Sequence, residues 1–316
     1  MIQNISVLGA GTMGHGIAEV FALAGYPVKL YDTSEKMLEA VPGIMRQEMS
    51  FMAENELITQ DDVENALQRI TLFHDLAAAV GGADYVIEAT PENMELKQNL
   101  FKHLDELCKP ECVLASNTSS LPLDGMMQKV SEARKTYMMV CHWYNPAHLM
   151  PIAELSFFGN MPEAVYQEVA AIYKKAGKQT VRVKKDVPGL VANRIQQGVA
   201  REVFSIMEQG IADPEDVEKA LKFGPAFRYA TTGQLVVADM GGLDIWCTVG
   251  DNLLSVMDNR SEANPLLRQK VQEGKLGLKS GEGFFSYPAG QVEELKNKFN
   301  KKLIVQLKAS KNYIED

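Results

Sequence analysis

Cysteine is scarce in this chain, and its arrangement excludes a disulfide-stapled scaffold. Four cysteines occur in 316 residues, with no CxxC pair and no regular spacing typical of disulfide-bonded domains: Cys108, Cys112, Cys141 and Cys247. Disulfide-dense domains and cysteine-based zinc motifs both need regular, closely spaced cysteines. We therefore expect a reduced, cytoplasmic protein.

Long apolar runs and a positive net charge are also missing. No apolar stretch approaches the ~20 residues that a membrane span needs, and the chain starts with a strand-like run, so we expect no signal peptide. The net charge of −9 disfavours nucleic acid as a partner, because such binding needs a broad basic face. The lysine-rich tail from Lys296 to Lys311, which lacks acids, is the local exception. Most such runs are solvated helix faces.

Histidine is scarce as well, with five in the chain. Neither the histidines nor the cysteines show the short spacing of zinc ligands, and His142 and His148 are too far apart for one helical face. The sequence therefore predicts no metal site. His15, just inside the first helix-length segment, is interpreted as a surface or packing residue.

What the chain does contain is an alternation of short β-branched runs and helix-length segments. This pattern is typical of a parallel sheet with crossover helices. Strands are predicted at 5–8, 28–31, 85–88, 113–115, 137–141 and 180–183. The stretch 35–67 is helical apart from a break near 58–61, where Thr59 and Asp62 have the spacing of a helix cap. We expect it to form a helical hairpin that projects from the sheet.

A glycine-rich turn follows the first predicted strand and opens a helix. In Gly9-Ala-Gly11-Thr12-Met13-Gly14, the three glycines suit a tight turn, close approach of a pyrophosphate, and helix–strand packing. Asp32 ends the next strand, where its carboxylate can accept the ribose hydroxyls of NAD, and no arginine follows to bind a 2′-phosphate. We predict an NAD site made by Gly9, Gly11, Thr12, Met13, Gly14 and Asp32.

Strand patterns end at KKDVPG, residues 184–189, and apolar residues then recur at helical spacing. We expect an α/β Rossmann-type parallel sheet domain with the hairpin insertion over 1–186. An all-α C-terminal domain over 187–316 would follow.

A histidine–glutamate pair is the candidate base. Hydride transfer from an alcohol to NAD also requires that the hydroxyl proton leave, so a base must lie beside the cofactor. His142 directly follows the strand at 137–141, at the carboxyl end where ligands gather in open α/β sheets. Glu154 comes twelve residues later, across a proline-bounded return, and can orient the imidazole.

Six segments together resemble the short-chain L-3-hydroxyacyl-CoA dehydrogenase family. They are GAGTMG, VIEATPENMELKQNLF, ASNTSSL, HWYNPAHLMPIAEL, DVPGLVANRI and LGLKSGEGFFSY, spread from residue 5 to about residue 287. The resemblance implies an NAD-dependent oxidation of a 3-hydroxy group to a ketone, with L (S) stereochemistry and a homodimer. His142 would be the general acid/base and Glu154 its orienting partner.

The resemblance also implies roles for further residues. Ser119, with Ser120 as the alternative, and Asn193 would bind the reacting oxygen of the substrate. The remaining family positions would contact the cofactor: Glu92, Lys97, Asn117, Asn145 and Lys279.

Two features depart from family members that act on coenzyme A thioesters. The hairpin, which holds coenzyme A phosphates with lysines in the family, has no lysine from Met37 to Glu95 and carries Glu54 and Glu56. The second domain has Gly224-Pro-Ala-Phe-Arg228, closer to relatives acting on small free acids, so Arg228 is the candidate for gripping a carboxylate. We therefore favour a small 3-hydroxy carboxylic acid as substrate.

Three other functions stay open. One is a short-chain L-3-hydroxyacyl-CoA dehydrogenase, such as a 3-hydroxybutyryl-CoA dehydrogenase of fatty acid metabolism. Another is the 3-hydroxyisobutyrate type, whose catalytic lysine is missing here. The third is a non-catalytic NAD-binding structural or sensor protein, which the retained His142–Glu154 pair disfavours.

Overall fold

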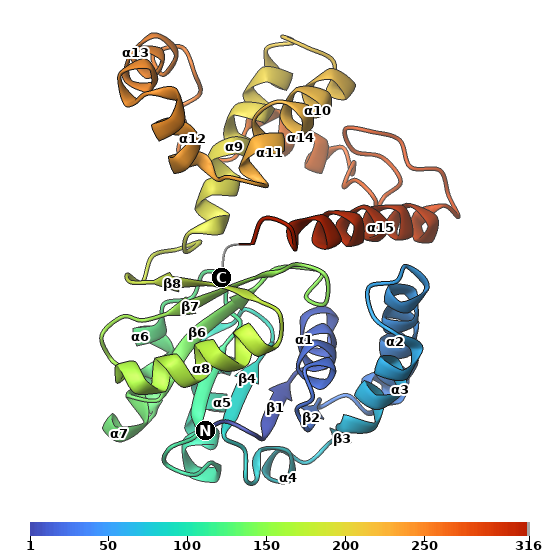
Figure 1. Ribbon diagram of the computed structural model, residues 1–316, viewed down its shortest axis with the longest axis vertical. Helices are drawn as coiled ribbons and strands as arrows, with labels where there is room; N and C mark the ends of the chain where they lie inside the picture. The colour runs from blue at the N-terminus through green and yellow to red at the C-terminus, as the bar shows by residue number, and fades with distance from the viewer. Residues whose placement is uncertain (315–316) are drawn as a thin grey trace. The chain divides into compact units, whose positions relative to one another are not determined.

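The chain forms two compact units in the computed structural model, which describes residues 1–314. The first unit is Met1–Val191 and the second begins at Ala192. In the first unit eight strands form one sheet in the order β3-β2-β1-β4-β5-β6-β7-β8 (Figure 1). The strands are β1 (Ile5–Leu8), β2 (Val28–Tyr31), β3 (Ile70–Phe73), β4 (Tyr85–Glu88), β5 (Val113–Ser116), β6 (Met138–Trp143), β7 (Ile152–Ser156) and β8 (Gln179–Val183).

Strands β1 to β6 pair in parallel, in the strand order of a dinucleotide-binding fold. Strand β7 then pairs antiparallel with β6, and β8 pairs in parallel with β7. The predicted Rossmann-type α/β domain is confirmed.

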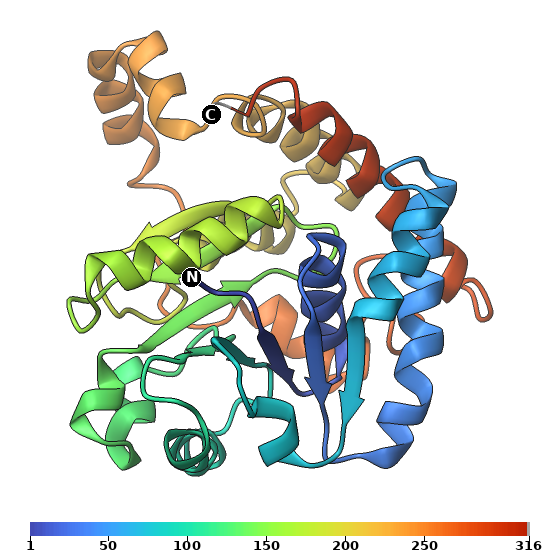
Figure 2. The ribbon, with the colours of Figure 1, turned by 60° about the horizontal axis from the view of Figure 1, so that its bottom comes forward.

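Helices cover both faces of this sheet, with α8 and α5 on opposite sides of the strands (Figure 2). One core lies between the sheet and the side chains of α1, α2, α3 and α8, and the other lies between the sheet and α4, α5 and α6. The helices are α1 (Thr12–Leu23), α2 (Glu35–Glu54), α3 (Gln60–Arg69), α4 (Leu76–Val80), α5 (Met94–Leu107), α6 (Leu123–Met126), the 3₁₀ turn η1 (Met127–Lys129), α7 (Glu132–Lys135) and α8 (Glu163–Lys175).

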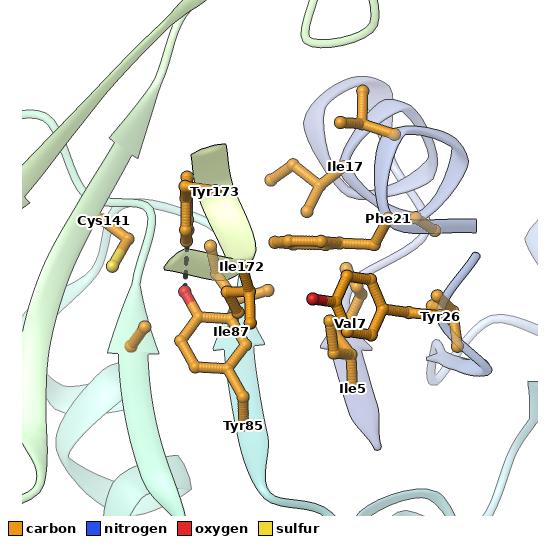
Figure 3. Packing of buried hydrophobic residues seen from close by; sticks show 14 of the residues in the cluster. Ile5, Val7, Ile17, Phe21, Tyr26, Tyr85, Ile87, Cys141, Ile172 and Tyr173 are labelled. Atoms are coloured by element: carbon orange, nitrogen blue, oxygen red, sulfur yellow. Dashed lines mark hydrogen bonds between the residues drawn. The ribbon is translucent and has the colours of Figure 1, made fainter. Parts of the chain in front are cut away.

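A cluster of buried aromatic rings fixes the centre of the first core (Figure 3). Phe21 of α1 packs edge-on against Tyr173 of α8 and Trp143 of β6, with ring centroids 5.5 Å apart in each pair. The Tyr173 hydroxyl bonds the hydroxyl of Tyr85 at 2.7 Å and accepts from Trp143 Nε1 at 3.0 Å. Edge-to-face pairs add about 0.5–1.5 kcal/mol each beyond their area burial. Trp143 is thereby anchored, and with it the end of β6.

The predicted helical hairpin is confirmed: α2 and α3 form it, and it packs against α1. Its break is capped as predicted, with Asp62 N donating to Thr59 Oγ1 at 3.1 Å and Thr59 N donating to Asp62 Oδ2 at 2.8 Å. The hairpin carries a continuous apolar stripe that needs a partner. The buried members of the stripe are Val41, Met45, Met49, Met52, Val63 and Ala66.

Three strand predictions need correction. Strand β3 was missed because its four residues directly follow α3. Strand β7 was missed because Glu154 interrupts its apolar run. Strand β6 was ended too early: it continues to Trp143, so His142 lies within the strand rather than after it.

The regular elements of the second unit, in its described part up to residue 314, are helices, joined by loops that contain two isolated bridges, Gly277 with Glu282 and Glu282 with Ser286. Its helices are α9 (Ala192–Glu208), α10 (Pro214–Phe223), α11 (Pro225–Tyr229), α12 (Gln234–Gly241), α13 (Leu243–Leu253), α14 (Pro265–Gln272) and α15 (Val292–Ser310). Within residues 1–314, no helix is both long and apolar enough to cross a membrane.

Candidate functional site

The glycine-rich turn between β1 and α1 has one glycine facing open space and two locked by packing. Gly9 has φ +97°, and a Cβ there would lie 2.8 Å from the Ala89 carbonyl oxygen. A Cβ on Gly14 would lie 1.6 Å from the Gly9 carbonyl oxygen, so α1 packs on β1 only without a side chain at this position. A Cβ on Gly11 would meet no atom within 4 Å. The open approach at Gly11 leaves room for a ligand against the start of α1.

Asp32 stands beside this turn at the end of β2. Its Oδ2 accepts from Ala10 N at 2.7 Å, and its Oδ1 accepts from Ser34 N at 2.8 Å. The carboxylate is therefore fixed in place next to the glycine-rich turn. This arrangement fits a dinucleotide, with the pyrophosphate at the helix start, beside Thr12 and Met13, and a ribose at Asp32.

His142 and Glu154 are direct neighbours on adjacent antiparallel strands. They are register partners of β6 and β7, and His142 Nδ1 lies 2.8 Å from Glu154 Oε2. Because a carboxylate only accepts, Nδ1 carries the proton and donates it, which leaves Nε2 to take a proton from a substrate. His142 is 6% exposed and Glu154 is fully buried.

The second carboxylate oxygen of Glu154 is also bonded. Its Oε1 accepts from the backbone N–H of Val191 at 2.9 Å. The segment leading to Val191 is held at two further points, since Asp186 Oδ2 accepts from Leu123 N at 2.7 Å and Gly189 N donates to the Ser119 carbonyl at 3.2 Å. Because each of its oxygens accepts a hydrogen bond, the buried carboxylate of Glu154 is held in one orientation. It can therefore position the His142 imidazole.

The loop after β5 lies next to the end of β6. Asn117 Oδ1 accepts from Trp143 N at 2.8 Å, one residue beyond His142. The following turn is organised by Glu92, whose Oε1 accepts from Thr118 Oγ1 at 2.5 Å and from Ser119 N at 3.2 Å. Ser120 also donates to this oxygen through its hydroxyl at 3.0 Å. These hydrogen bonds and the charge of Lys97 keep the pKa of Glu92 below its usual value even though partial burial opposes them.

Lys97 is not a solvated side chain but a buried one, 1% exposed. Its Nζ lies 2.7 and 2.8 Å from the two carboxylate oxygens of Glu88 and 3.7 Å from Glu92 Oε2. Glu88, at the end of β4, also accepts from Ser116 and from Thr90. The structure therefore places Lys97 in a buried ion pair with Glu88, next to the turn that Glu92 organises.

The remaining residues that the sequence predicts to bind cofactor or substrate lie in loops and helices. Asn145 is exposed, two residues beyond β6. Asn193 is the second residue of α9, and Arg228 is an exposed residue of α11. Lys279 is exposed in the turn that contains the two bridges.

Sequence reasoning missed three residues that organise this site: Glu88, Thr118 and Asp186. Glu88 could have been recognised from the sequence, because a carboxylate at the end of an apolar strand in the centre of a sheet needs a buried partner. Thr118 and Asp186 could not, since each acts through bonds to segments remote in the sequence.

The comparisons with known proteins cover nearly the whole chain. The model of the 3-hydroxyacyl-CoA dehydrogenase NAD binding domain matches residues 4–187, and that of the 3-hydroxyacyl-CoA dehydrogenase C-terminal domain matches residues 189–287. The chain belongs to the 3-hydroxyacyl-CoA dehydrogenase family. It is an NAD-dependent oxidoreductase that acts on CH–OH groups.

Two curated relatives within this family carry different substrates in their names. A 5-formyl-3-hydroxy-2-methylpyridine 4-carboxylate 5-dehydrogenase of Mesorhizobium japonicum is 33% identical over 309 residues, covering 96% of this chain and 97% of the relative. A probable 3-hydroxybutyryl-CoA dehydrogenase of Bacillus subtilis is 36% identical over 287 residues, covering 90% of this chain and 98% of the relative.

Solved structures show the same two relationships. A crystal structure of the pyridine carboxylic acid dehydrogenase, described as an NAD⁺-dependent dismutase, matches with a TM-score of 0.88 at 31% identity, over 96% of this chain and 97% of that one. The (S)-3-hydroxybutyryl-CoA dehydrogenase of Ralstonia eutropha matches with a TM-score of 0.74 at 30% identity, over 91% of this chain and 100% of that one.

Proposed function

We propose that this dehydrogenase acts on a small hydroxy acid with a free carboxylate, and not on a coenzyme A thioester. Bound NAD would accept the hydride, and the chain's own residues would handle the proton. His142 would take the hydroxyl proton on Nε2, with Glu154 keeping Nδ1 protonated. Ser119 and Asn193 would hold the reacting oxygen. Acid–base help of this kind is worth roughly 10²–10⁴ in rate.

The charge of the α2–α3 hairpin is the observation that carries the substrate class. Its exposed side chains include Glu54, Glu56 and Asp61, and no lysine lies between Met37 and Glu95. Both arginines of the stretch are already engaged. Arg46 forms an ion pair with Glu64, and Arg69 donates to the Ala22 carbonyl. Lys36 is exposed in the first turn of α2, but beyond it the hairpin surface is acidic and would repel the phosphates of coenzyme A.

Arg228 is the candidate for binding the substrate carboxylate. It is exposed on α11, and its guanidinium makes no hydrogen bond or ion pair with residues 1–314. A guanidinium suits a carboxylate because it can donate two parallel hydrogen bonds. The Mesorhizobium relative, whose named substrate contains a carboxylate, supports this choice.

A short-chain 3-hydroxyacyl-CoA dehydrogenase is the second candidate. The Bacillus relative, 36% identical, supports it. The exposed lysines of α15, which include Lys298, Lys301 and Lys302, offer an alternative basic surface for the nucleotide of coenzyme A.

Assembly and location form part of the same proposal. We propose a homodimer in the cytoplasm, without nucleic acid or membrane partners. The apolar side chains exposed on α12 and α13 of the second unit, such as Leu235 (82% exposed) and Met240 (80%), support burial against a second copy.

A comparison of two substrate classes tests the substrate. Loss of NADH absorbance would be followed with acetoacetyl-CoA and, in parallel, with a panel of free 3-keto acids. We expect turnover of a free acid, with a KM raised about tenfold or more in Arg228→Ala, because a charge-assisted hydrogen bond to a carboxylate contributes about 1.5–3 kcal/mol. Lys222→Ala, exposed on the neighbouring α10, is the matched control and should keep the wild-type KM.

Efficient turnover of acetoacetyl-CoA would overturn the free-acid proposal and leave the second candidate. Tight NADH binding without turnover of either class would contradict both.

A further inference from the structure

Two histidines and two glutamates form a buried cluster beside the glycine-rich turn. His15 and Glu19 lie on α1, Glu48 lies on α2, and His148 lies in the segment between β6 and β7. His15 is 7% exposed, His148 9% and Glu19 0%. All four belong to the first unit, and none belongs to the proposed NAD or proton-transfer site.

Three distances within this cluster are close to those between ligands around one ion. His15 Nε2 lies 3.1 Å from Glu48 Oε2, and His148 Nδ1 lies 3.5 Å from Glu48 Oε2 and 3.6 Å from Glu19 Oε2. Metal–ligand bonds of 2.0–2.2 Å at the corners of a tetrahedron separate the ligands by about 3.3–3.6 Å. Ligand atoms of His15, Glu19 and Glu48 all lie within 4.8 Å of one another, and His148 adjoins this set through the two glutamates.

The cluster also leaves buried oxygens without hydrogen bonds. Within residues 1–314, neither carboxylate oxygen of Glu19 has a hydrogen-bond partner, although the side chain is fully buried. The contact with His148 Nδ1 at 3.6 Å compensates the charge of Glu19 only in part. A buried carboxylate is costly unless it is paired, coordinates a metal or becomes protonated.

His15 is oriented as metal-binding histidines are. Its Nδ1 lies 3.4 Å from the Ala10 carbonyl oxygen, which can only accept, so the proton belongs on Nδ1. Without an ion, Nε2 can donate its proton to Glu48 Oε2, 3.1 Å away, and a metal bound between them would take the place of that proton. A backbone carbonyl that fixes the tautomer in this way is a common second interaction of ligating histidines.

We propose that His15, Glu19, Glu48 and His148 bind a divalent transition-metal ion, with zinc as the best fit. Two imidazoles and two carboxylates suit Zn²⁺ in a four-coordinate structural site. The Glu48 side chain is 30% exposed and gives the ion a way in. The ion joins α1, α2 and the segment after β6. The His15–Ala10 contact also ties it to the glycine-rich turn.

Sequence spacing could not reveal this site. Two ligands sit four residues apart on α1, but the others come from α2 and from a loop more than a hundred residues later. The sequence prediction of no metal site rested on local spacing alone.

Metal binding to the full chain after dialysis against a chelator tests the proposal. We expect one Zn²⁺ per chain by titration calorimetry and elemental analysis, a rise in Tm with added Zn²⁺, and a four-coordinate visible spectrum with Co²⁺. Glu19→Gln should weaken Zn²⁺ binding by at least about 100-fold, more than loss of an outer contact does. Glu39→Gln, an exposed carboxylate of the same α2, should behave as wild type.

The Glu19→Gln substitution also separates the metal site from its alternative. Burial and the neighbouring charge of Glu48 raise the pKa of Glu19 well above its usual value. A glutamine keeps the shape of this side chain and removes the charge that burial disfavours, so the variant should fold with an unchanged or higher Tm in chelator. Absence of Zn²⁺ binding in the wild type, or equal binding in Glu19→Gln, would overturn the proposal and leave a proton-sharing network. His148→Asn, with the same readouts, decides if Glu19→Gln fails to fold.

Discussion

Two glutamates in the first unit are equally buried yet have opposite surroundings. Glu154 has each oxygen bonded, one to His142 and one to the backbone of Val191. Glu19 is just as inaccessible and has neither oxygen bonded within residues 1–314. Donors stabilise the charged form of a carboxylate, whereas burial alone favours the neutral form. The same residue type therefore serves as an ionic positioning group in one place and as a candidate ligand in the other.

Replacing Glu154 by glutamine should slow the chemical step without disturbing the cofactor site. An amide can present its NH₂ group to the imidazole, which favours the wrong tautomer of His142. We expect kcat to fall by roughly 10²–10⁴, as when the orienting acid of a catalytic triad is changed to an amide. Single-turnover kinetics and NADH fluorescence titration would measure rate and affinity separately.

Glu111→Gln, an exposed carboxylate of the same unit, is the control for this substitution and should leave kcat unchanged. A Glu154→Gln enzyme with wild-type kcat would remove Glu154 from the proton-transfer site. A variant that loses NADH affinity to the same extent as kcat would show that Glu154 serves the fold instead.

At the level of single residues, the sequence predicted what depends on local pattern. The glycine turn, Asp32 and the His142–Glu154 pair could be found because each marks a strand end or a short return. The burial of Lys97 and the meeting of His15 with His148 could not, because they depend on which helices pack together. Packing of distant segments leaves no periodic signal in the sequence.

At the level of elements, strands with a strong apolar pattern were predictable and the others were not. The bounds of β1, β2 and β4 agree with the prediction, since each has three apolar residues in four. Strand β7 was missed because its catalytic candidate, Glu154, breaks the pattern that would have revealed it. Residues placed for function interrupt the patterns that predict structure.

The glycine turn between β1 and α1 offers a matched pair of substitutions. Gly14→Ala would put a Cβ 1.6 Å from the Gly9 carbonyl oxygen, so we expect loss of at least about 3 kcal/mol of stability or failure to fold. Gly11→Ala meets no protein atom within 4 Å and should fold normally, while NAD affinity falls tenfold or more because the methyl group occupies the ligand's space. Chemical denaturation and NADH titration would measure the two effects.

Equal losses of stability in the two alanine variants would contradict this separation of roles. Unchanged NAD affinity in Gly11→Ala would remove the turn from the cofactor site.

At the level of the whole molecule, the two units differ in how much apolar surface they bury. The first unit has two extensive cores. In the second, no residue of α11, α12 or α13 is buried, and large apolar side chains such as Leu235 and Met240 are exposed. Large apolar side chains exposed on consecutive helices are typical of an association site.

Charges on α12 should therefore separate the proposed homodimer. We expect Leu235→Glu combined with Met240→Glu to be monomeric by size-exclusion chromatography with light scattering, because paired buried charges on a symmetric interface are strongly unfavourable. Binding of NADH by the first unit should persist. Lys302→Glu on α15 is the control and should remain dimeric. A monomeric wild type, or a dimeric double variant, would contradict the proposed assembly.

The pairing of β6 with β7 has an evolutionary consequence. His142 and Glu154 meet because they are opposite one another in a strand ladder, so their geometry is stored in backbone hydrogen bonds and not in the loop between them. A shift of one residue would turn Glu154 to the other face of the sheet, and selection must therefore preserve the pairing. The geometry of the pair therefore does not depend on the sequence of the loop, residues 144–151, except where that loop contacts the cofactor. A lineage can thus acquire a residue such as His148 there, and with it a new property, while the inherited reaction continues.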